Sequence, residues 1–210
     1  MIRILLADDH ALVREGLKQL FSLTTDIVIA AGVTNGMQVL KTLSTDVFDV
    51  LLLDMTMPGV SGTDLITRVV TLTPHPPVLV LSMHNEPQIA RRALAAGAMG
   101  YLTKDCDPST LLTAVRRVAG GGRYIDPVMA EFMAFEHQDK QAAGGHQHLS
   151  NREFQVLCLL ASGKSVNDIA QELSISNKTV STHKARLMEK MSFSNNAEIV
   201  RYAMDRRLIA

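Results

Sequence analysis

The first 125 residues alternate five times between a short aliphatic run and a longer amphipathic stretch. The runs are IRILLA, IVIAA, VLLL, VLVLS and GYLT, and the stretches that follow them are ALVREGLKQLF, MQVLKTL, DLITRVVTL, QIARRALAA and STLLTAVRRVA. Short aliphatic runs indicate strands, and apolar residues spaced three and four apart indicate helices. Strands without polar alternation are buried on both sides, so this pattern predicts a five-stranded parallel sheet with helices on both faces.

The pattern stops at a polar segment, HQDKQAAGGHQH, whose paired glycines and lack of apolar period predict a mobile tether. Residues 1–125 hold 11 Lys/Arg and 11 Asp/Glu, residues 126–148 hold 1 and 4, and residues 149–210 hold 9 and 6. Only the last part is basic, at 9 − 6 = +3. We therefore expect an α/β domain at 1–125, a linker at 126–148 and a small all-α domain at 149–210.

Histidines and cysteines give no metal or redox signature. His137, His146 and His148 lack Cys partners and helical spacing, so we expect a solvated linker there rather than a metal cluster. Cys106 and Cys158 are far apart and predict free thiols in a reducing, cytoplasmic setting. Spanning a bilayer needs roughly 18 residues, and no uncharged run near that length is free of proline, so we expect a soluble chain with no membrane partner.

Polar residues stand where the predicted strands end. Asp8 and Asp9 follow the first run, Asp54 follows the third, Ser82 ends the fourth, and Lys104 follows the fifth. The carboxyl ends of parallel strands meet at one edge of a sheet, so these side chains should converge. Three carboxylates in one crevice repel one another unless a lysine and a hard cation such as Mg²⁺ compensate. A carboxylate beside Mg²⁺ and an ammonium can act as the nucleophile in phosphoryl transfer, so this set predicts that chemistry.

The motifs ADDH, LLLDMTMPGVSG, VLS and GYLTKD make residues 1–125 resemble the receiver domain of two-component response regulators. The resemblance implies a flavodoxin-like sheet in the order 2-1-3-4-5. It also implies that Asp54 accepts a phosphoryl group from a phosphohistidine of a sensor histidine kinase. Asp9, Asp54 and the Thr56 carbonyl would then bind Mg²⁺, and Asp8 would hold a metal-bound water.

The same resemblance implies a switch. Lys104 would pair with the phosphoryl oxygens, the Ser82 hydroxyl would move towards them, and the Tyr101 ring would turn inwards to fill the space. Thr56 and His84 would set the lifetime of the phosphoryl group.

The last 62 residues carry helix-start signals. In HLSNREFQVLCLLASG, Ser150 and Glu153 have the spacing of a capping box, and Gly163 should end the helix. In SVNDIAQEL, Ser165 and Asp168 have the same capping-box spacing and predict the start of a second helix. A third helix, NKTVSTHKARLMEKM, follows the turn SIS. Two short helices and a tight turn predict a helix-turn-helix, with a plain helical bundle as the alternative.

The third helix has two faces. Val180, His183, Leu187 and Met191 fall on one side, where we expect His183 to be packed and hydrogen-bonded. We expect the other side to face the major groove of DNA. The predicted contacts are Lys178, Thr179, Ser181, Thr182, Lys184, Ala185 and Arg186.

The segment from LSNREF to LMEKM resembles the DNA-binding domain of NarL- and LuxR-type (FixJ-like) transcription factors. The combined resemblance implies a transcriptional regulator that binds double-stranded promoter DNA, forms a homodimer when phosphorylated, and has RNA polymerase as a candidate partner. A fourth helix is expected in NNAEIVRYAMDRRLIA. By resemblance it joins two DNA-binding domains, although packing within its own domain would explain the sequence equally simply.

Two other functions fit parts of the pattern. A Mg²⁺-dependent phosphatase with an Asp nucleophile would use the same groups, but it needs a second acid two residues after the nucleophile, where this chain has Thr56. A phosphorylated protein-interaction module would not need the basic third helix. We therefore expect no enzymatic activity beyond self-phosphorylation and slow autodephosphorylation.

Overall fold

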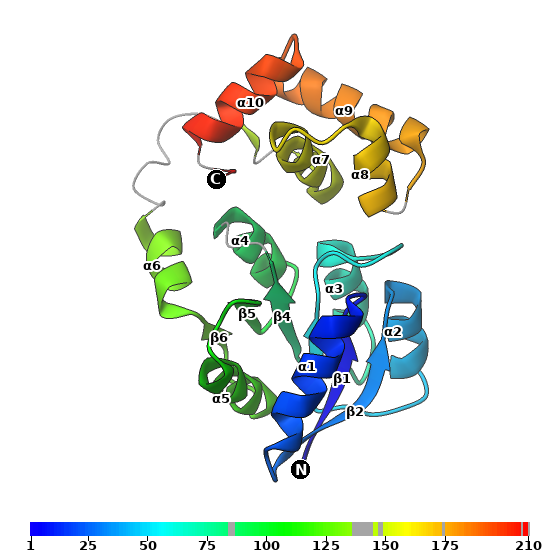
Figure 1. Ribbon diagram of the computed structural model, residues 1–210, viewed down its shortest axis with the longest axis vertical. Helices are drawn as coiled ribbons and strands as arrows, with labels where there is room; N and C mark the ends of the chain where they lie inside the picture. The colour runs from blue at the N-terminus through cyan, green and yellow to red at the C-terminus, as the bar shows by residue number, and fades with distance from the viewer. Residues whose placement is uncertain (84–86, 136–144, 147–148, 174, 207, 210) are drawn as a thin grey trace. The chain divides into compact units, whose positions relative to one another are not determined.

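The computed structural model describes residues 1–83, 87–135, 145–146, 149–173, 175–206 and 208–209. The chain divides into two compact units, Met1–Phe135 and Glu136–Ala210 (Figure 1). Within the described residues, no helix is both long enough and apolar enough to cross a bilayer.

The first unit contains a parallel sheet. Its strands are β1 (Ile2–Ala7), β2 (Ile27–Val33), β3 (Val50–Leu53), β4 (Val78–Ser82), β5 (Gly100–Thr103) and β6 (Tyr124–Ile125), in the order β2-β1-β3-β4-β5-β6. The parallel architecture and the order of the first five strands are as predicted. The sixth strand was not predicted, because two residues paired only to β5 are too short to show a periodicity.

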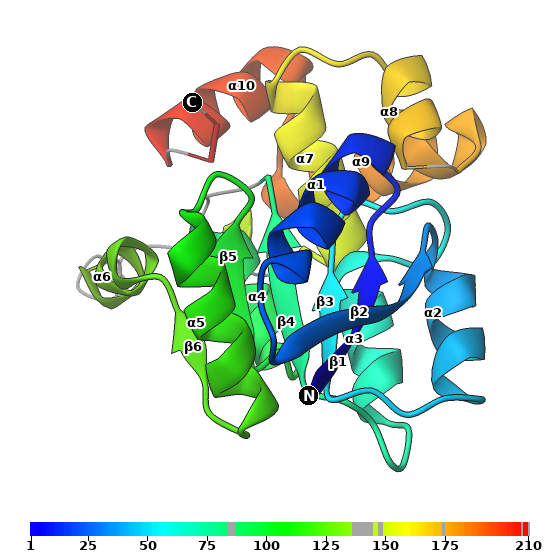
Figure 2. The ribbon, with the colours of Figure 1, turned by 60° about the horizontal axis from the view of Figure 1, so that its bottom comes forward.

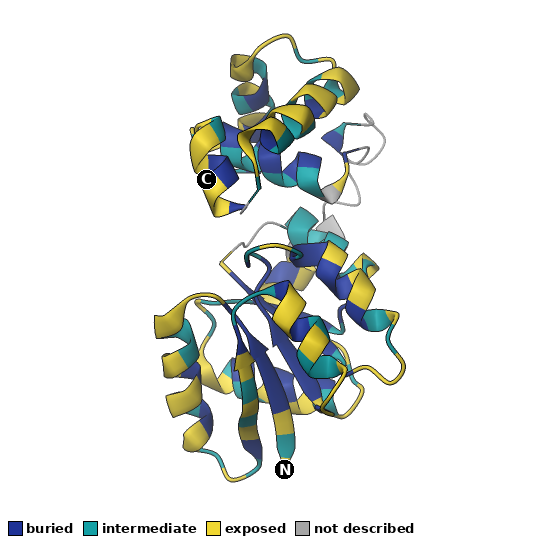
Figure 3. Ribbon diagram, turned by 90° about the vertical axis from the view of Figure 1, so that its right-hand side faces the viewer, coloured by how far each residue is buried: buried dark blue, intermediate teal, exposed yellow. Residues whose placement is uncertain are grey.

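Five helices cover the two faces of the sheet, and they are α1 (Ala11–Ser22), α2 (Gly36–Leu43), α3 (Gly62–Val70), α4 (Pro87–Ala95) and α5 (Pro108–Ala119). One core lies between the sheet and α2, α3 and α4, and the other lies between the sheet and α1 and α5 (Figure 2). The strands β1, β3 and β4 alternate between these two cores, so nearly all of their residues are buried (Figure 3). This double burial accounts for their continuous aliphatic sequences.

Helix α6 (Pro127–Phe135) occupies the first part of the predicted linker. The Asp126 carboxylate accepts hydrogen bonds from the Val128 and Met129 N–H groups at the start of the helix. Met129 is buried in the core next to α4, and Arg91 of α4 donates a hydrogen bond to the Met133 carbonyl. The tether prediction is therefore wrong for residues 127–135, which pack on the α/β unit. Residues 136–144 and 147–148, with the predicted His137 and His148, lie outside the described residues, as does His84.

The second unit consists of α7 (Asn151–Ala161), α8 (Val166–Glu172), α9 (Asn177–Met191) and α10 (Asn196–Asp205). Both predicted capping boxes are present, at Ser150 with Glu153 and at Ser165 with Asp168. Gly163, at φ +82°, follows the end of α7 as expected. Three helices with tight connections and a fourth at the C-terminus confirm the predicted all-α domain.

His146 belongs to this helical unit. It is buried, its ring lies 5.5 Å from the Phe154 ring, and its Nδ1 atom is 2.7 Å from the Tyr202 hydroxyl. A Cβ on Gly145 would clash with that hydroxyl, so the chain passes Tyr202 closely there. The prediction of a solvated His146 is therefore wrong, because packing that involves α10, more than 50 residues away, is invisible in the local sequence.

Candidate functional site

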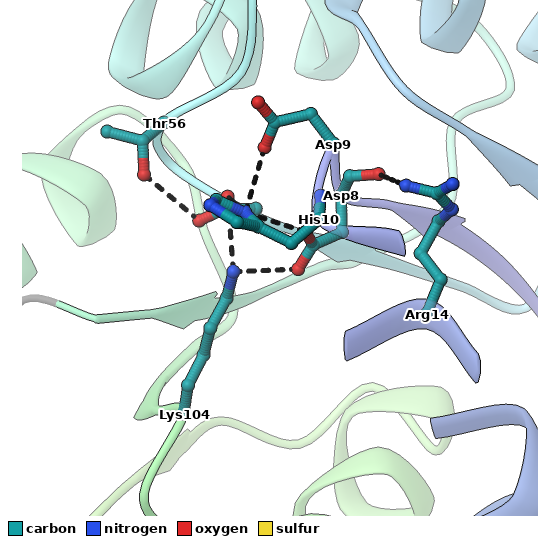
Figure 4. Close-up of polar contacts among 7 residues, drawn as sticks. Asp8, Asp9, His10, Arg14, Thr56 and Lys104 are labelled. Atoms are coloured by element: carbon teal, nitrogen blue, oxygen red, sulfur yellow. Dashed lines mark hydrogen bonds and ion pairs between the residues drawn. The ribbon is translucent and has the colours of Figure 1, made fainter. Parts of the chain in front are cut away.

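Three charged side chains meet at the carboxyl edge of the sheet (Figure 4). The Asp54 N–H donates to the Ala7 carbonyl at 2.8 Å, which sets the end of β3 beside Asp8. The Lys104 N–H donates to the Ser82 carbonyl at 2.8 Å, which fixes the residue that follows β5. The parallel register of the strands thus brings together residues that are up to 96 positions apart, as the strand-end argument predicted.

The Lys104 ammonium lies between two buried carboxylates. Its Nζ atom is 2.7 Å from Asp8 Oδ2 and 3.2 Å from Asp54 Oδ2. The three side chains are only 6%, 2% and 0% exposed, respectively, so water screens these charges weakly. Lys104 therefore holds the two carboxylates together in a site where they would otherwise repel each other.

The pKa of the Asp54 carboxyl is raised above its ordinary value of 3.8. Burial is the largest cause, and the Asp8 charge acts in the same direction, whereas the Lys104 charge opposes both. The Thr56 hydroxyl donates to Asp54 Oδ1 at 3.3 Å. The carboxylate is thus kept poorly solvated beside a cation, as suits a nucleophile.

The residues at this edge fit a divalent cation. Single ligand atoms from Asp8, Asp9, His10 and Asp54 lie within 4.8 Å of one another. Three carboxylates and one lysine leave a formal charge of −3 + 1 = −2, which a divalent ion would neutralise. Oxygen ligands of this kind suit Mg²⁺.

Two residues at the site were not predicted from the sequence. His10 Nδ1 is 3.0 Å from Asp9 Oδ1 and 3.2 Å from Asp8 Oδ1. Arg14 of α1 donates to the Asp8 carbonyl at 2.9 Å. In the sequence, His10 follows the acidic pair directly, and this position could have indicated that it belongs to the site. Arg14 carries no such indication, because its contact with Asp8 depends on where helix α1 lies.

Ser82 and Tyr101, the predicted switch pair, are both fully buried. Ser82 ends β4 and pairs with Thr103, and Tyr101 lies on the neighbouring strand. The Tyr101 ring occupies the core that also contains Ala93 of α4 and Met129 of α6. The structure therefore has the ring in the inward position.

Helix α9 exposes the face that the sequence predicted. Val180 and Leu187 are buried, and His183 and Met191 are partly buried. On the other side the exposed residues are Lys178, Ser181, Thr182, Ala185 and Arg186, while Thr179 and Lys184 are partly buried.

Two hydroxyls on α9 have partners inside the protein. Thr179 Oγ1 is 2.8 Å from the hydroxyl of the N-cap residue Ser176, and Thr182 donates to the Lys178 carbonyl at 2.9 Å. Of the hydroxyl residues predicted to contact DNA, Ser181 is therefore the most available.

His183 is packed as predicted, but its Nδ1 atom is buried without a hydrogen-bond partner among the described residues. Burial lowers the pKa of the imidazole, and the nearby Arg152 charge adds to this effect. The predicted hydrogen bond is thus not made by Nδ1, and a neutral ring packed on the inner face of α9 fits a structural residue.

Helix α10 has both an inner and an outer apolar side. Ile199 and Ala203 are buried inside the helical unit. The outer side has an open hollow, where Met204 is 63% exposed. The hollow is lined by Ala197, Val200, Arg201, Met204 and Asp205. The inner side explains packing within the domain, and the outer side leaves an apolar surface for the predicted contact with a second copy.

An Asp-Lys site at the carboxyl edge of a parallel sheet, followed in one chain by a helix-turn-helix unit, defines a receiver coupled to a DNA-binding domain. The chain belongs to the response regulators with a LuxR-type DNA-binding domain: residues 4–116 match the response regulator receiver domain, and residues 147–203 match the luxR family of bacterial regulatory proteins.

The similarity to characterised proteins extends over both units. The chain is 39% identical to the transcriptional regulatory protein UhpA of Escherichia coli K12, over 98% of this chain and 99% of UhpA. Solved structures of RcsB are also similar. One contains two RcsB dimers bound to two parallel DNAs (25% identity, TM-score 0.61, 97% of this chain and 98% of RcsB). Another contains RcsB from Salmonella enterica serovar Typhimurium bound to promoter P1flhDC with the phosphomimetic BeF3⁻ (25% identity, TM-score 0.61, 96% and 97%).

Proposed function

We propose that Asp54 is the phosphoryl acceptor of this regulator and that its phosphorylation controls binding of α9 to promoter DNA. The observation that carries the proposal is the buried Asp54 carboxylate held 3.2 Å from Lys104 at the end of β3. A solvated structural aspartate would need neither the burial nor the cation.

In the proposed reaction, a carboxylate oxygen of Asp54 attacks the phosphorus of a phosphohistidine on a sensor histidine kinase. The new P–O bond forms as the P–N bond breaks, and the histidine nitrogen leaves with the bonding electron pair. Lys104 shifts its ammonium from the carboxylates to the phosphoryl oxygens. Mg²⁺ bound by Asp9, Asp54 and the Thr56 carbonyl, with a water held by Asp8, would supply further positive charge.

We further propose that the switch acts through α6. The Ser82 hydroxyl would bond to the phosphoryl group and stabilise the inward Tyr101 ring. That ring shares a core with Ala93 of α4 and Met129 of α6, so its position sets how α4 and α6 pack. Helix α6 is the last element of the first unit along the chain. We therefore propose that its packing transmits phosphorylation of Asp54 to the helical unit.

The partners follow from the two domains. The receiver implies a sensor kinase, and the DNA-bound RcsB dimers support a homodimer on double-stranded DNA, here through the outer side of α10. RNA polymerase is a proposed further partner, since regulators of transcription act on it. A protein that acts on promoter DNA belongs in the bacterial cytoplasm, where we place it.

We propose no catalytic activity beyond self-phosphorylation and slow autodephosphorylation. The position where a phosphatase with an Asp nucleophile needs a second acid carries Thr56, whose hydroxyl donates to Asp54 instead of supplying an acid group. Helix α9, with its exposed Lys178 and Arg186, also argues against an interaction module that does not bind DNA.

The acceptor assignment is tested by incubating the full chain with labelled acetyl phosphate and Mg²⁺. We expect Asp54→Asn to abolish labelling, because the amide is not a nucleophile for this reaction. Asp46→Asn changes an exposed carboxylate of the same unit and should be labelled like the wild type. Full labelling of Asp54→Asn would show that another residue accepts the phosphoryl group.

Removal of the metal gives a second test. We expect EDTA to stop labelling of the wild type, and Asp9→Ala to need a much higher Mg²⁺ concentration because it lacks a direct ligand. Titration calorimetry should show weaker Mg²⁺ binding by Asp9→Ala. An affinity equal to that of the wild type would exclude Asp9 as a ligand.

A further inference from the structure

The imidazole of His10 lies among the carboxylates of the proposed metal site (Figure 4). Its Nδ1 atom is 3.0 Å from Asp9 Oδ1, 3.2 Å from Asp8 Oδ1 and 3.9 Å from Asp54 Oδ2. The His10 side chain is 58% exposed, so this edge of the site opens to solvent.

These distances match the spacing of ligands around one ion. With ligands at about 2.1 Å, adjacent donor atoms of an octahedral ion lie about 3 Å apart, and opposite donors lie about 4.2 Å apart. The two shorter distances from Nδ1 have the adjacent spacing, and the distance to Asp54 falls between the two values. The Nδ1 atom is therefore placed so that it can join Asp9 and Asp54 around one cation, while Asp8 stays near enough to hold a water of that cation.

The backbone directs His10 towards this site. His10 is the N-cap residue of α1, with extended backbone angles, and its side chain makes no capping hydrogen bond. Its N–H donates to Asp8 Oδ1 at 2.8 Å, and Arg14 donates to the Asp8 carbonyl at 2.9 Å. The imidazole is thus not bonded to its own helix and lies against the carboxylates of Asp8 and Asp9.

We propose that His10 supplies a nitrogen ligand to the divalent cation of the receiver. The site should then favour Mn²⁺ or Co²⁺ over Mg²⁺ more strongly than an all-oxygen site does, since imidazole suits transition metals and carboxylate and water suit Mg²⁺. A neutral imidazole adds a donor without changing the formal charge of −2 on the carboxylates and Lys104. This inference rests on the metal site proposed above.

The test uses Mn²⁺ as a paramagnetic probe on the full chain. Pulsed electron paramagnetic resonance should detect a ¹⁴N coupling from a directly bound imidazole in the wild type. The coupling should vanish in His10→Gln and persist in His75→Gln, which changes an exposed histidine in the loop before β4. We expect His10→Gln to lose about tenfold or more in Mn²⁺ affinity and much less in Mg²⁺ affinity.

Wild-type chain with bound Mn²⁺ and no ¹⁴N coupling would overturn the inference, and so would an equal loss of Mn²⁺ and Mg²⁺ affinity in His10→Gln. These outcomes would leave the proposed function standing as long as Asp54 is labelled in a cation-dependent way. Labelling of Asp54 that needs no divalent cation would overturn both the metal site and the nitrogen ligand.

Discussion

At the scale of single residues, the site combines buried negative charge with one buried ammonium. Asp8 and Asp54 are taken out of water at the ends of β1 and β3, and Lys104 offsets only part of their repulsion. Such an arrangement costs stability in the resting protein. It leaves a net negative charge that a divalent cation can neutralise.

The raised pKa of Asp54 gives this cost a definite pH dependence. The pKa of this carboxyl is higher in the folded chain than its value of 3.8 in the unfolded chain. Its contribution to the free energy of unfolding is therefore fully present below pH 3.8 and is lost as the pH rises through the pKa of the folded chain. In metal-free buffer at pH 7, we therefore expect Asp54→Asn to stabilise the receiver by about 0.5–2 kcal/mol. The gain should shrink as the pH falls towards 4.

Urea unfolding of the wild type and Asp54→Asn between pH 7.5 and 4.5 measures this difference. Asp46→Asn, at an exposed position, should show no such trend. A gain that stays constant over the pH range, or a loss of stability at pH 7, would contradict the electrostatic account.

The sequence was informative about this site where the chemistry coincides with a strand end. Asp8, Asp54 and Lys104 each follow an apolar run, and parallel register then brings them together. His10 could not be assigned in this way, because the direction of its side chain depends on the backbone at the start of α1. The inward Tyr101 ring likewise depends on a choice of rotamer, which a strand pattern does not specify.

At the scale of elements, helix α9 separates packing from recognition. Its inner side is held by Val180 and Leu187, and its outer side offers Ser181 and Ala185 to the bases. We expect Lys178, Lys184 and Arg186 to contact phosphates instead of base edges. A serine and a methyl group cannot make the bidentate contact to guanine that Arg or Lys makes. Affinity should therefore come largely from phosphate contacts, and specificity should need two half-sites about one helical turn apart.

Two substitutions on α9 test this division. Lys184→Ala should weaken binding to all sequences alike and reduce the salt dependence by about one unit of slope. Ser181→Lys should strengthen binding and shift the preference towards guanine at one position of each half-site, by about 1–3 kcal/mol. Randomised-site selection with both variants measures the effects. A changed consensus for Lys184→Ala with none for Ser181→Lys would mean that α9 is oriented differently on DNA.

Helix α6 shows where reading elements from sequence failed. The whole segment 126–148 was predicted to be a tether because of the polar residues that follow α6. Asp126 followed by Pro127 is nevertheless a helix-start signal, and an apolar stretch follows it. His146 was missed for a different reason, since its burial depends on Phe154 and Tyr202 in helices that only the fold brings near.

At the scale of the whole molecule, the proposed switch links phosphorylation of Asp54 in one unit to DNA binding by the other. The physical connection inside the first unit is the core shared by Tyr101, α4 and Met129. Helix α6 is the last element of the first unit, so a switch that acts through this core must make DNA binding by the second unit depend on the state of Asp54.

The most direct measurement is the affinity of the full chain for a selected DNA site, determined by fluorescence anisotropy at fixed salt before and after treatment with acetyl phosphate and Mg²⁺. We predict that phosphorylation raises the affinity of the wild type on the order of tenfold, within the range usual for coupling between two sites. The affinity of Asp54→Asn should stay at the untreated wild-type level. Equal affinities of phosphorylated and unphosphorylated wild type, or the same gain in Asp54→Asn, would contradict the claim that Asp54 controls DNA binding.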